Sequence, residues 1–141
     1  MLYSIPLEAG VAAAFSVVGL ALMALGFMLI DLLTPGNLRE QIWLHRNRNA
    51  TVLVSSNLLG VGIIVTSAIT ASEDAVIAGL VSTVVYGVLG LILMGLSFLV
   101  ADLLTPGSLG ALLMESTPHP AAWVTGTSHL VVAAVVSAAL L

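Results

Sequence analysis

Four long apolar runs, over residues 9–33, 50–71, 75–104 and 121–141, dominate the chain, and short polar stretches separate them. Each run exceeds the ~20 residues that an α-helix needs to cross about 30 Å of hydrocarbon. The pattern therefore predicts an all-α polytopic membrane protein with four transmembrane helices in a single membrane domain, residues 1–141. We expect the first helix to be retained, because the first ten residues lack the basic region of a removable signal peptide.

Composition supports the membrane assignment and excludes several functions. Sixty per cent of the residues are hydrophobic and only 7 per cent are charged, whereas about 25 per cent are charged in a typical soluble domain. The chain has no cysteine, which excludes disulfides, thiolate metal sites and cysteine catalysis. Its only cations besides histidine are three arginines, too few for the clustered phosphate contacts that nucleic-acid binding requires.

The hexapeptide DLLTPG occurs twice, at residues 31–36 and 102–107, each time at the end of an apolar run. With an offset of 71, residues 17–38 align with 88–109, and 14 of the 22 positions are identical. We interpret this as an internal duplication, with repeats over 9–71 and 75–141. Because each repeat holds two spans, the halves are expected to run parallel, related by an axis along the membrane normal.

The residues of the motif predict a helix stop followed by a new helix. Pro35 cannot donate a backbone hydrogen bond and disfavours helical geometry at the preceding residue. Gly36 can adopt a positive φ and reverse the chain. Asn37 then resembles a helix N-cap, with Glu40 placed as in a capping box. In the second copy Ser108 repeats the cap, and alanine replaces the glutamate.

The three arginines all lie between the first and second spans, so the positive-inside rule places this loop, residues 39–48, in the cytoplasm. Both termini and the turn at residues 72–74 are then outside. Residues 38–48 also contain apolar side chains and predict an interfacial helix on the cytoplasmic leaflet. The residues expected to contact lipid or a partner are Arg39, Trp43, Arg46 and Arg48.

Asp31 and Asp102 are the charged residues of greatest interest. A carboxylate near a helix C-terminus faces the negative end of the helix dipole, so something should compensate it. One interpretation is that each aspartate tethers its turn by bonding Thr34, Thr105 or an arginine. The other is that the pair lines a cation or proton path.

A polar layer is expected deeper in the membrane, where Asn57 and His129 lie about eight residues inside the second and fourth spans. Interhelical hydrogen bonding is the simpler interpretation of this layer. An intramembrane imidazole can also relay protons near neutral pH. The same layer contains Ser55, Ser56, Thr125 and Thr127.

Small residues repeat at alternating steps of four and three along the first and third spans. Such stripes let helix backbones approach closely. We expect the two stripes to face each other within one chain, although they could also join copies of the chain. The stripes comprise Ala12, Ser16, Gly19, Met23 and Gly26 in the first span, and Thr83, Gly87, Gly90, Met94 and Ser97 in the third.

The four spans, the tandem repeat and the duplicated turn together resemble the YjfL-like family of small bacterial inner-membrane proteins of unknown function. The resemblance covers essentially the whole chain. It implies a bacterial cytoplasmic membrane, no known catalytic activity, and protein partners in envelope stress. The motif residues that carry it are Asp31, Thr34, Pro35 and Gly36, with Asp102, Thr105, Pro106 and Gly107.

Three classes of function remain. A non-catalytic subunit that forms a homo-oligomer or docks into a membrane complex fits the short loops and the small-residue stripes. An oligomeric ion or proton channel or transporter fits the aspartate pair together with the Asn57 and His129 layer. An intramembrane enzyme comes last, because no nucleophile–base or metal-ligand pattern is present in the sequence. We therefore expect no enzyme activity, no cofactor and no metal.

Overall fold

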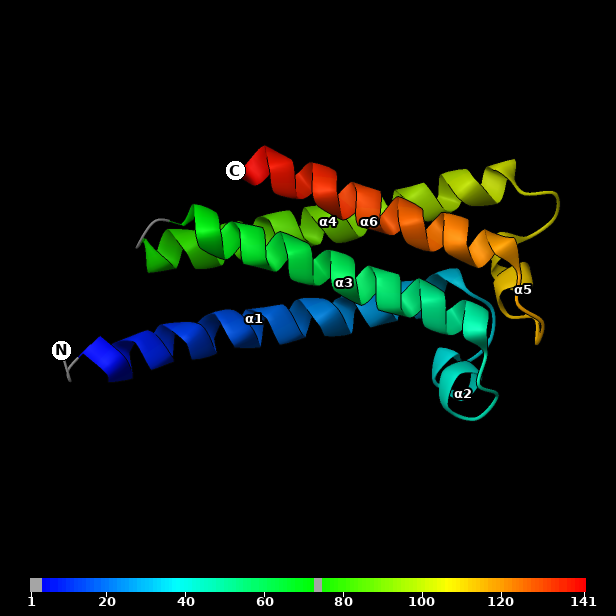
Figure 1. The fold of residues 1–141 in the computed structure, drawn as a ribbon, viewed down its shortest axis with the longest axis horizontal. Coiled ribbons are helices and arrows are strands. Elements are labelled where there is room, and N and C mark those ends of the chain that lie inside the picture. The colour runs from blue at the N-terminus through cyan, green and yellow to red at the C-terminus, as the bar shows by residue number, and fades with distance from the viewer. Residues whose placement is uncertain (1–3, 73–74) are drawn as a thin grey trace.

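The computed structural model describes residues 4–72 and 75–141, which form helices joined by short loops (Figure 1). The turn predicted at residues 72–74 lies mostly outside these residues. In chain order the helices are α1 (Ser4–Leu33), α2 (Leu38–Trp43), α3 (Arg48–Ala71), α4 (Val76–Leu104), α5 (Leu109–Leu113) and α6 (Pro120–Leu140).

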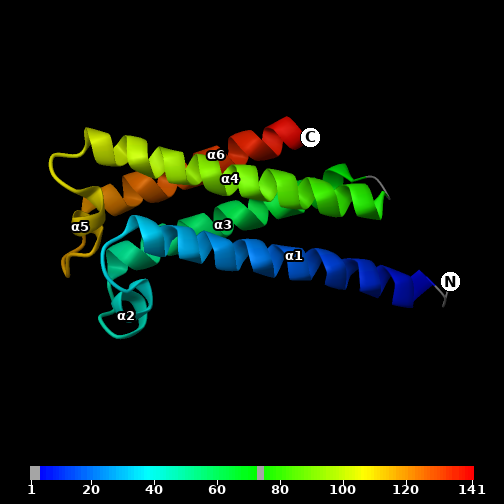
Figure 2. The same cartoon turned by 180° about the vertical axis from the view of Figure 1, so that it is seen from behind.

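The four long helices, α1, α3, α4 and α6, are each long and apolar enough to span a membrane. They follow the predicted spans closely, except that α1 begins at Ser4, five residues earlier than expected. Helices α1 and α4 run in one direction and α3 and α6 in the other, so both short helices lie at the same end of the bundle (Figures 1 and 2). The prediction of an all-helical, four-span membrane protein is confirmed.

The bundle is built around the α3–α6 pair, which shares the most extensive interface. Glycines allow this close approach: a side chain at Gly126 would meet Ser56 Oγ at 2.5 Å, and one at Gly60 would meet Ala133 Cβ at 3.2 Å. Between apolar helices in lipid, such close backbone packing is a main source of association. Helix α4 packs on both central helices, whereas α1 packs on α3 and α4 and makes no comparable interface with α6.

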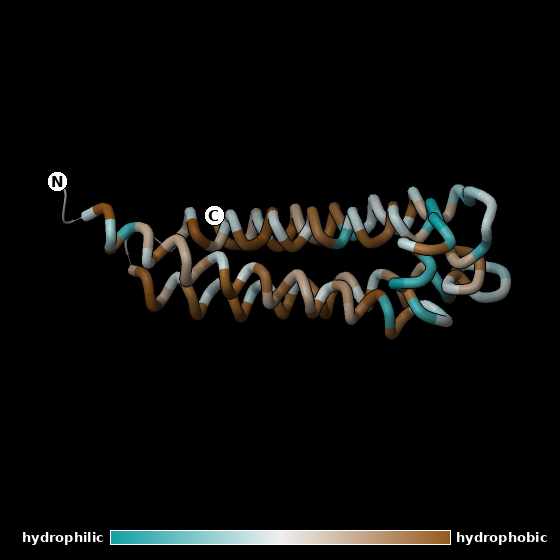
Figure 3. The backbone as a smooth tube through the Cα atoms, turned by 90° about the horizontal axis from the view of Figure 1, so that it is seen from below, coloured by the Kyte–Doolittle hydropathy of each residue, from teal (hydrophilic) through white to brown (hydrophobic). Residues whose placement is uncertain are grey.

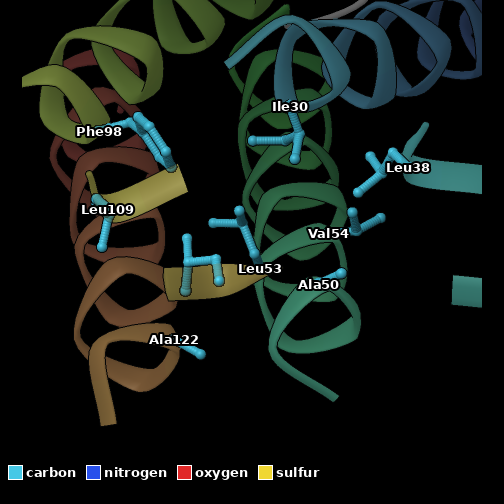
Figure 4. Packing of buried hydrophobic residues seen from close by; sticks show 9 residues of the cluster. Ile30, Leu38, Ala50, Leu53, Val54, Phe98, Leu109 and Ala122 are labelled. Atoms are coloured by element: carbon cyan, nitrogen blue, oxygen red, sulfur yellow. The ribbon is translucent and has the colours of Figure 1, made fainter. Parts of the chain in front are cut away.

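Two groups of buried apolar side chains fill the bundle. The group at the loop end ties the short helices to the long ones, because Leu38 and Leu109, the first residues of α2 and α5, are both buried in it (Figure 4). The other group lies farther along the spans. It consists of Leu22, Val61, Ile64, Leu91, Met94, Ala133 and Val136.

The outside of the bundle is apolar, as a lipid-facing surface must be. Large side chains such as Leu20, Ile77 and Leu99 are exposed along the spans. Hydrophilic residues gather instead at the end that carries the short helices (Figure 3). This distribution fits four membrane-spanning helices with one polar, loop-bearing end.

The expectation that the two small-residue stripes face each other is wrong. The stripe on α4 is buried at Thr83, Gly87, Gly90 and Met94, and Ser97 is half-buried. On α1, by contrast, Ala12, Ser16 and Met23 are exposed, Gly19 is half-buried and only Gly26 is buried. Helix α1 is rotated so that Phe15, Leu22 and Ile30 face the core, since burying these larger side chains removes more apolar surface.

Candidate functional site: the duplicated turn and the buried polar layer

The two copies of the hexapeptide form the same turn. Helices α1 and α4 end two residues before the motif proline, at Leu33 and Leu104. Gly36 has a φ of +85° and Gly107 a φ of +95°. This is the left-handed region that glycine enters without steric strain. The predicted helix stop and chain reversal are therefore present in both copies.

Each motif aspartate bonds the backbone at the start of the next short helix. The Leu38 N–H donates to Asp31 Oδ1 at 2.9 Å, and the Leu109 N–H donates to Asp102 Oδ1 at 2.7 Å. The first N–H groups of a helix have no partner within the helix, and they offset a carboxylate at the negative end of the preceding one. The aspartates thus join the end of one helix to the beginning of the next.

The partners proposed for the aspartates from the sequence were the wrong ones. The Thr34 hydroxyl donates to the Ile30 carbonyl at 2.8 Å, and the Thr105 hydroxyl donates to the Ala101 carbonyl at 2.7 Å. Neither threonine reaches its aspartate. The threonines instead close the last turn of their own helices, which a β-branched hydroxyl does readily.

The predicted caps are present, but the capping box is not. Asn37 Oδ1 accepts hydrogen bonds from the N–H groups of Arg39 at 3.0 Å and Glu40 at 3.5 Å. Ser108 Oγ accepts one from the Ala111 N–H at 3.3 Å. Within the described part of the chain, the Glu40 carboxylate makes no hydrogen bond back to the cap, so one side of the reciprocal pair is missing.

The predicted interfacial helix over residues 38–48 is shorter than expected, because α2 ends at Trp43. Arg46 then adopts a positive φ of 51°, and Asn47 caps α3 by accepting a hydrogen bond from the Ala50 N–H at 3.1 Å. A cap for a new helix requires extended backbone, which interrupts the first helix. Arg39, Arg46 and Arg48 are all exposed.

Asn49 is a connecting residue that the sequence patterns did not reveal. Its side chain is 2% exposed. Asn49 Nδ2 donates to the Thr117 carbonyl at 2.9 Å and to the Glu115 carbonyl at 3.4 Å, and Oδ1 accepts from the His119 N–H at 2.8 Å. This single amide joins the start of α3 to the loop before α6. Its sequence signal is weak, since asparagines at helix starts are common.

Asn57 and His129, the residues of the predicted polar layer, are both fully buried. Asn57 Nδ2 lies 3.3 Å from Met94 Sδ on α4. Among the described residues, Asn57 Oδ1 and the ring nitrogens of His129 make no hydrogen bond of ordinary geometry, although the Met94 backbone lies close enough to the imidazole to interact with it. Buried polar groups in proteins are nearly always paired, so three unpaired atoms at this depth mark the layer as a candidate site.

Glycines bring the four long helices together at this layer. A side chain at Gly26 of α1 would meet Asn57 Oδ1 at 2.5 Å. One at Gly60 of α3 would meet Met94 Cε of α4 at 2.5 Å and the His129 carbonyl oxygen of α6 at 3.5 Å. Asn57 and His129 therefore lie where the four long helices pack closely together.

The hydroxyl groups of the layer do not form the interhelical bonds that we expected of them. Ser56 donates to the Val52 carbonyl, and Thr125 donates to the Ala121 carbonyl, each within its own helix. Ser55 and Thr127 are exposed. The hydroxyl pair that does cross between helices is Ser67 with Ser137, from α3 and α6, outside the predicted layer.

The structure keeps the aspartates apart from the polar layer. Asp31 and Asp102 lie at the loop end, where they bond the turns. A groove of about 970 Å³ is lined mainly by α1 and α3, and a hollow of about 550 Å³ lies beside α2. Neither is lined by Asn57, His129 or either aspartate. In residues 4–72 and 75–141, no three His, Asp or Glu side chains lie close enough to hold a metal ion.

Comparison with known proteins identifies relatives along the whole chain. Residues 4–140 match the model of the Domain of Unknown Function (DUF350) family. A UPF0719 transmembrane protein of Mycolicibacterium paratuberculosis is 36% identical over 123 residues, covering 87% of this chain and 82% of the relative. A UPF0719 transmembrane protein of Mycobacterium bovis is 34% identical over 137 residues, covering 96% of this chain and 90% of the relative. No solved structure matches the chain.

Proposed function

The chain belongs to the DUF350 family of transmembrane proteins of unknown function, and we propose that it is a non-catalytic membrane subunit that assembles with copies of itself. Two observations support the proposal: the exposed groove along α1, and the hydrogen bonds that already hold both motif aspartates. The aspartates of the duplicated motif act in this proposal as turn anchors, because each already bonds a backbone amide.

The outward stripe of α1 is the observation that carries the proposal. Ala12, Ser16, Gly19 and Met23 line the 970 Å³ groove together with residues of α3. The matching stripe on α4 is covered within the chain, where side chains at Gly87 and Gly90 would meet Leu22 of α1 and Ile64 of α3. The same sequence pattern thus packs against helices in one half and is open in the other.

An open small-residue groove suits another helix better than it suits lipid. Small side chains permit a partner backbone to approach closely and gain dispersion contacts that flexible acyl chains provide less well. A second copy of the chain carries apolar helices of the kind that already cover the α4 stripe. The proposed assembly is therefore a homo-oligomer joined through α1.

The proposed orientation places the end with the two short helices in the cytoplasm and both termini outside. It follows from the three arginines, which all lie at that end, in the segment from α2 to the first residue of α3. The proposed location is the inner membrane of a bacterium, because the relatives named above are transmembrane proteins of mycobacteria.

Subunit counting by single-molecule photobleaching in lipid vesicles tests the proposal with the variant Gly19→Leu. In the fold, a Cβ added at Gly19 would contact Val65 Cγ1 at an ordinary 3.7 Å, and the rest of a leucine can extend into the groove, so the chain should still fold. The added leucine would fill the groove and lower the subunit count toward one. Ala21→Leu is the matched control, because Ala21 is exposed on α1 but does not line the groove.

Unchanged subunit counts in Gly19→Leu, from protein with a helical content equal to the parent, would contradict assembly through this groove. A monomeric parent protein would contradict self-assembly altogether. Loss of assembly in the Ala21 control as well would show that the effect is not specific to the groove.

A proton or cation transporter is a second candidate, favoured by the unpaired atoms of Asn57 and His129 in the middle of the bundle. Ionisable groups inside a membrane are costly and are commonly functional. Proton and cation flux into vesicles tests this candidate, with His129→Leu beside the double variant Asp31→Asn/Asp102→Asn. Flux that is lost only in His129→Leu would favour the polar layer as the path. No flux in the parent protein would eliminate the candidate.

A further inference from the structure

Helix α2 lies outside the bundle, against the flank of a membrane-spanning helix. It projects sideways at the loop end (Figures 1 and 2). The Trp43 ring packs on Phe27 of α1, with ring centroids 6.3 Å apart. Phe27 precedes the end of α1 by six residues, or about 9 Å of helix. Trp43 therefore lies beside α1, short of the end of that helix. Tryptophan at the end of a membrane span commonly borders both acyl chains and headgroups.

The outer side of this segment is apolar as well as exposed. Trp43 is 67% exposed and Leu44 is 73% exposed, whereas Leu38 is buried and anchors the helix to the bundle. The 550 Å³ hollow beside α2 is lined by Asn37, Arg39, Glu40, Trp43 and Leu44. It combines an apolar wall, a guanidinium and an amide, with Glu40 as its one acidic group.

All three arginines of the chain lie around this segment, and none forms an ion pair within residues 4–72 and 75–141. Two of them are held in locally unfavourable positions. Arg46 has a positive φ of 51°, a conformation that is sterically unfavourable for residues with a Cβ. Arg48 is the first residue of α3, where the positive end of the helix dipole opposes a cation. An external anion would offset the second of these, because it would interact favourably with both the Arg48 guanidinium and the positive end of the α3 dipole.

We propose that the α2 segment, residues 37–48, binds the headgroup of an anionic phospholipid in the adjacent leaflet. An arginine guanidinium can donate two parallel hydrogen bonds to two oxygens of a headgroup phosphate. Trp43 and Leu44 meet the upper part of the acyl chains. Cationic side chains beside exposed apolar ones, next to the end of a membrane-spanning helix, fit a phospholipid with a negatively charged headgroup. This proposal requires membrane insertion but is independent of assembly through α1.

The second half of the chain lacks such a site, which makes it an internal comparison. Helix α5 has Leu109, Gly110 and Leu113 buried, and no arginine or lysine lies in its loop. A side chain at Gly110 would meet Pro35 Cδ at 3.0 Å, so this helix packs beneath the first turn. The duplicated turns thus support two different short helices, of which α2 alone combines exposed aromatic and cationic side chains.

The two tryptophans of the chain permit a test with a matched reporter. Trp123→Phe leaves Trp43 as the only indole, and Trp43→Phe leaves Trp123, which is 68% exposed near the start of α6 at the same end. Each variant is placed in phosphatidylcholine vesicles containing a small fraction of lipid brominated on its acyl chains. The brominated lipid is either phosphatidylglycerol or phosphatidylcholine. Bromine quenches the fluorescence of an adjacent indole.

We expect brominated phosphatidylglycerol to quench Trp43 more strongly than brominated phosphatidylcholine does. The local enrichment should be roughly fivefold for each arginine that contacts the headgroup. It should decrease as salt screens the charges. In the triple variant Arg39→Gln/Arg46→Gln/Arg48→Gln, the two brominated lipids should quench Trp43 equally. They should also quench Trp123 equally in the Trp43→Phe reporter.

Equal quenching of Trp43 by the two lipids would overturn the proposal and would favour an acidic protein segment as the occupant. A preference that survives in the triple arginine variant would overturn it too. An equal preference at Trp123 would show general enrichment of anionic lipid around the bundle and would contradict a site at α2. All three arginines are exposed, so the glutamine variant should retain the fold, which circular dichroism verifies.

Discussion

The carboxylate of Asp102 accepts a hydrogen bond of 2.7 Å from the backbone N–H of Leu109, seven residues later. The same bond joins Asp31 to Leu38 at 2.9 Å in the first half of the chain. An aspartate at the end of a spanning helix therefore caps the short helix that follows it. This relationship explains why a carboxylate is tolerated at the negative end of a helix dipole, and it gives the duplicated motif a structural role.

Replacing Asp102 tests that role. Asp102→Ala should lower the free energy of unfolding by about 1.5–3 kcal/mol, because it removes a hydrogen bond to a charged acceptor. Asp102→Asn keeps an oxygen acceptor at the same place and should lose less. Unfolding in mixed detergent micelles, followed by circular dichroism, measures both. If asparagine were as disruptive as alanine, the charge itself would be required and the capping role would be insufficient.

Gly36→Ala should destabilise the protein through the backbone alone. Gly36 has a φ of +85°, and nothing lies within 4 Å of the position that its Cβ would take. The expected loss is of the order of 1–2 kcal/mol, the usual penalty of an L-residue in the left-handed region. Gly36→Asn should lose less, since asparagine tolerates this conformation better.

Gly62→Ala is the matched control for this prediction. Gly62 also has nothing within 4 Å of an added Cβ, but it lies inside helix α3, where alanine is favoured over glycine. Thermal unfolding of the two variants should therefore shift in opposite directions. A neutral Gly36→Ala would mean that the turn can relax without its positive φ.

His129→Leu should leave the stability of the bundle unchanged or raise it. In the described part of the chain, neither ring nitrogen of the fully buried His129 makes a hydrogen bond of ordinary geometry, so an apolar side chain of similar size removes polar groups that gain little from burial. His129→Ala provides the contrast, because the cavity it leaves should destabilise the bundle by about 2–5 kcal/mol. Unfolding in detergent, with both variants side by side, measures the difference.

A destabilised His129→Leu would show that the imidazole has a hydrogen-bond partner in the membrane, such as a bound water. A stabilised His129→Leu that has lost flux in vesicles would identify a residue retained for transport at the expense of stability.

Asn49→Ala should be among the more damaging changes at the loop end. It removes three hydrogen bonds from the buried Asn49 amide to the backbones of Glu115, Thr117 and His119, for an expected loss of about 2–4 kcal/mol. Asn49→Asp keeps the acceptor for the His119 N–H but replaces the donor amide with a second acceptor oxygen. It should therefore restore little of the stability that Asn49→Ala loses. Asn37→Ala, at an exposed cap, should lose only ~1 kcal/mol. Comparable losses at Asn37 and Asn49 would contradict the role of Asn49 as a connector.

The sequence by itself determined the elements of the fold. Long apolar runs must become helices in lipid, since each backbone polar group has to be satisfied within its own segment. Pro35 and Gly36, repeated as Pro106 and Gly107, end a helix and reverse the chain for reasons of local sterics, and local rules suffice to place them. The caps at Asn37 and Ser108 also depend only on neighbouring residues.

The tertiary structure alone decided which faces meet. The two stripes have the same spacing but face different surroundings, because α1 packs on α3 and α4 and makes no comparable interface with α6. No local rule contains that asymmetry. Asn49 bonds the Thr117 backbone, 68 residues later in the chain. The Ser67–Ser137 pair joins α3 and α6 outside the polar layer that the sequence predicted. Periodicity states which residues share one face of a helix. Which neighbour covers that face depends on the packing of all the helices together.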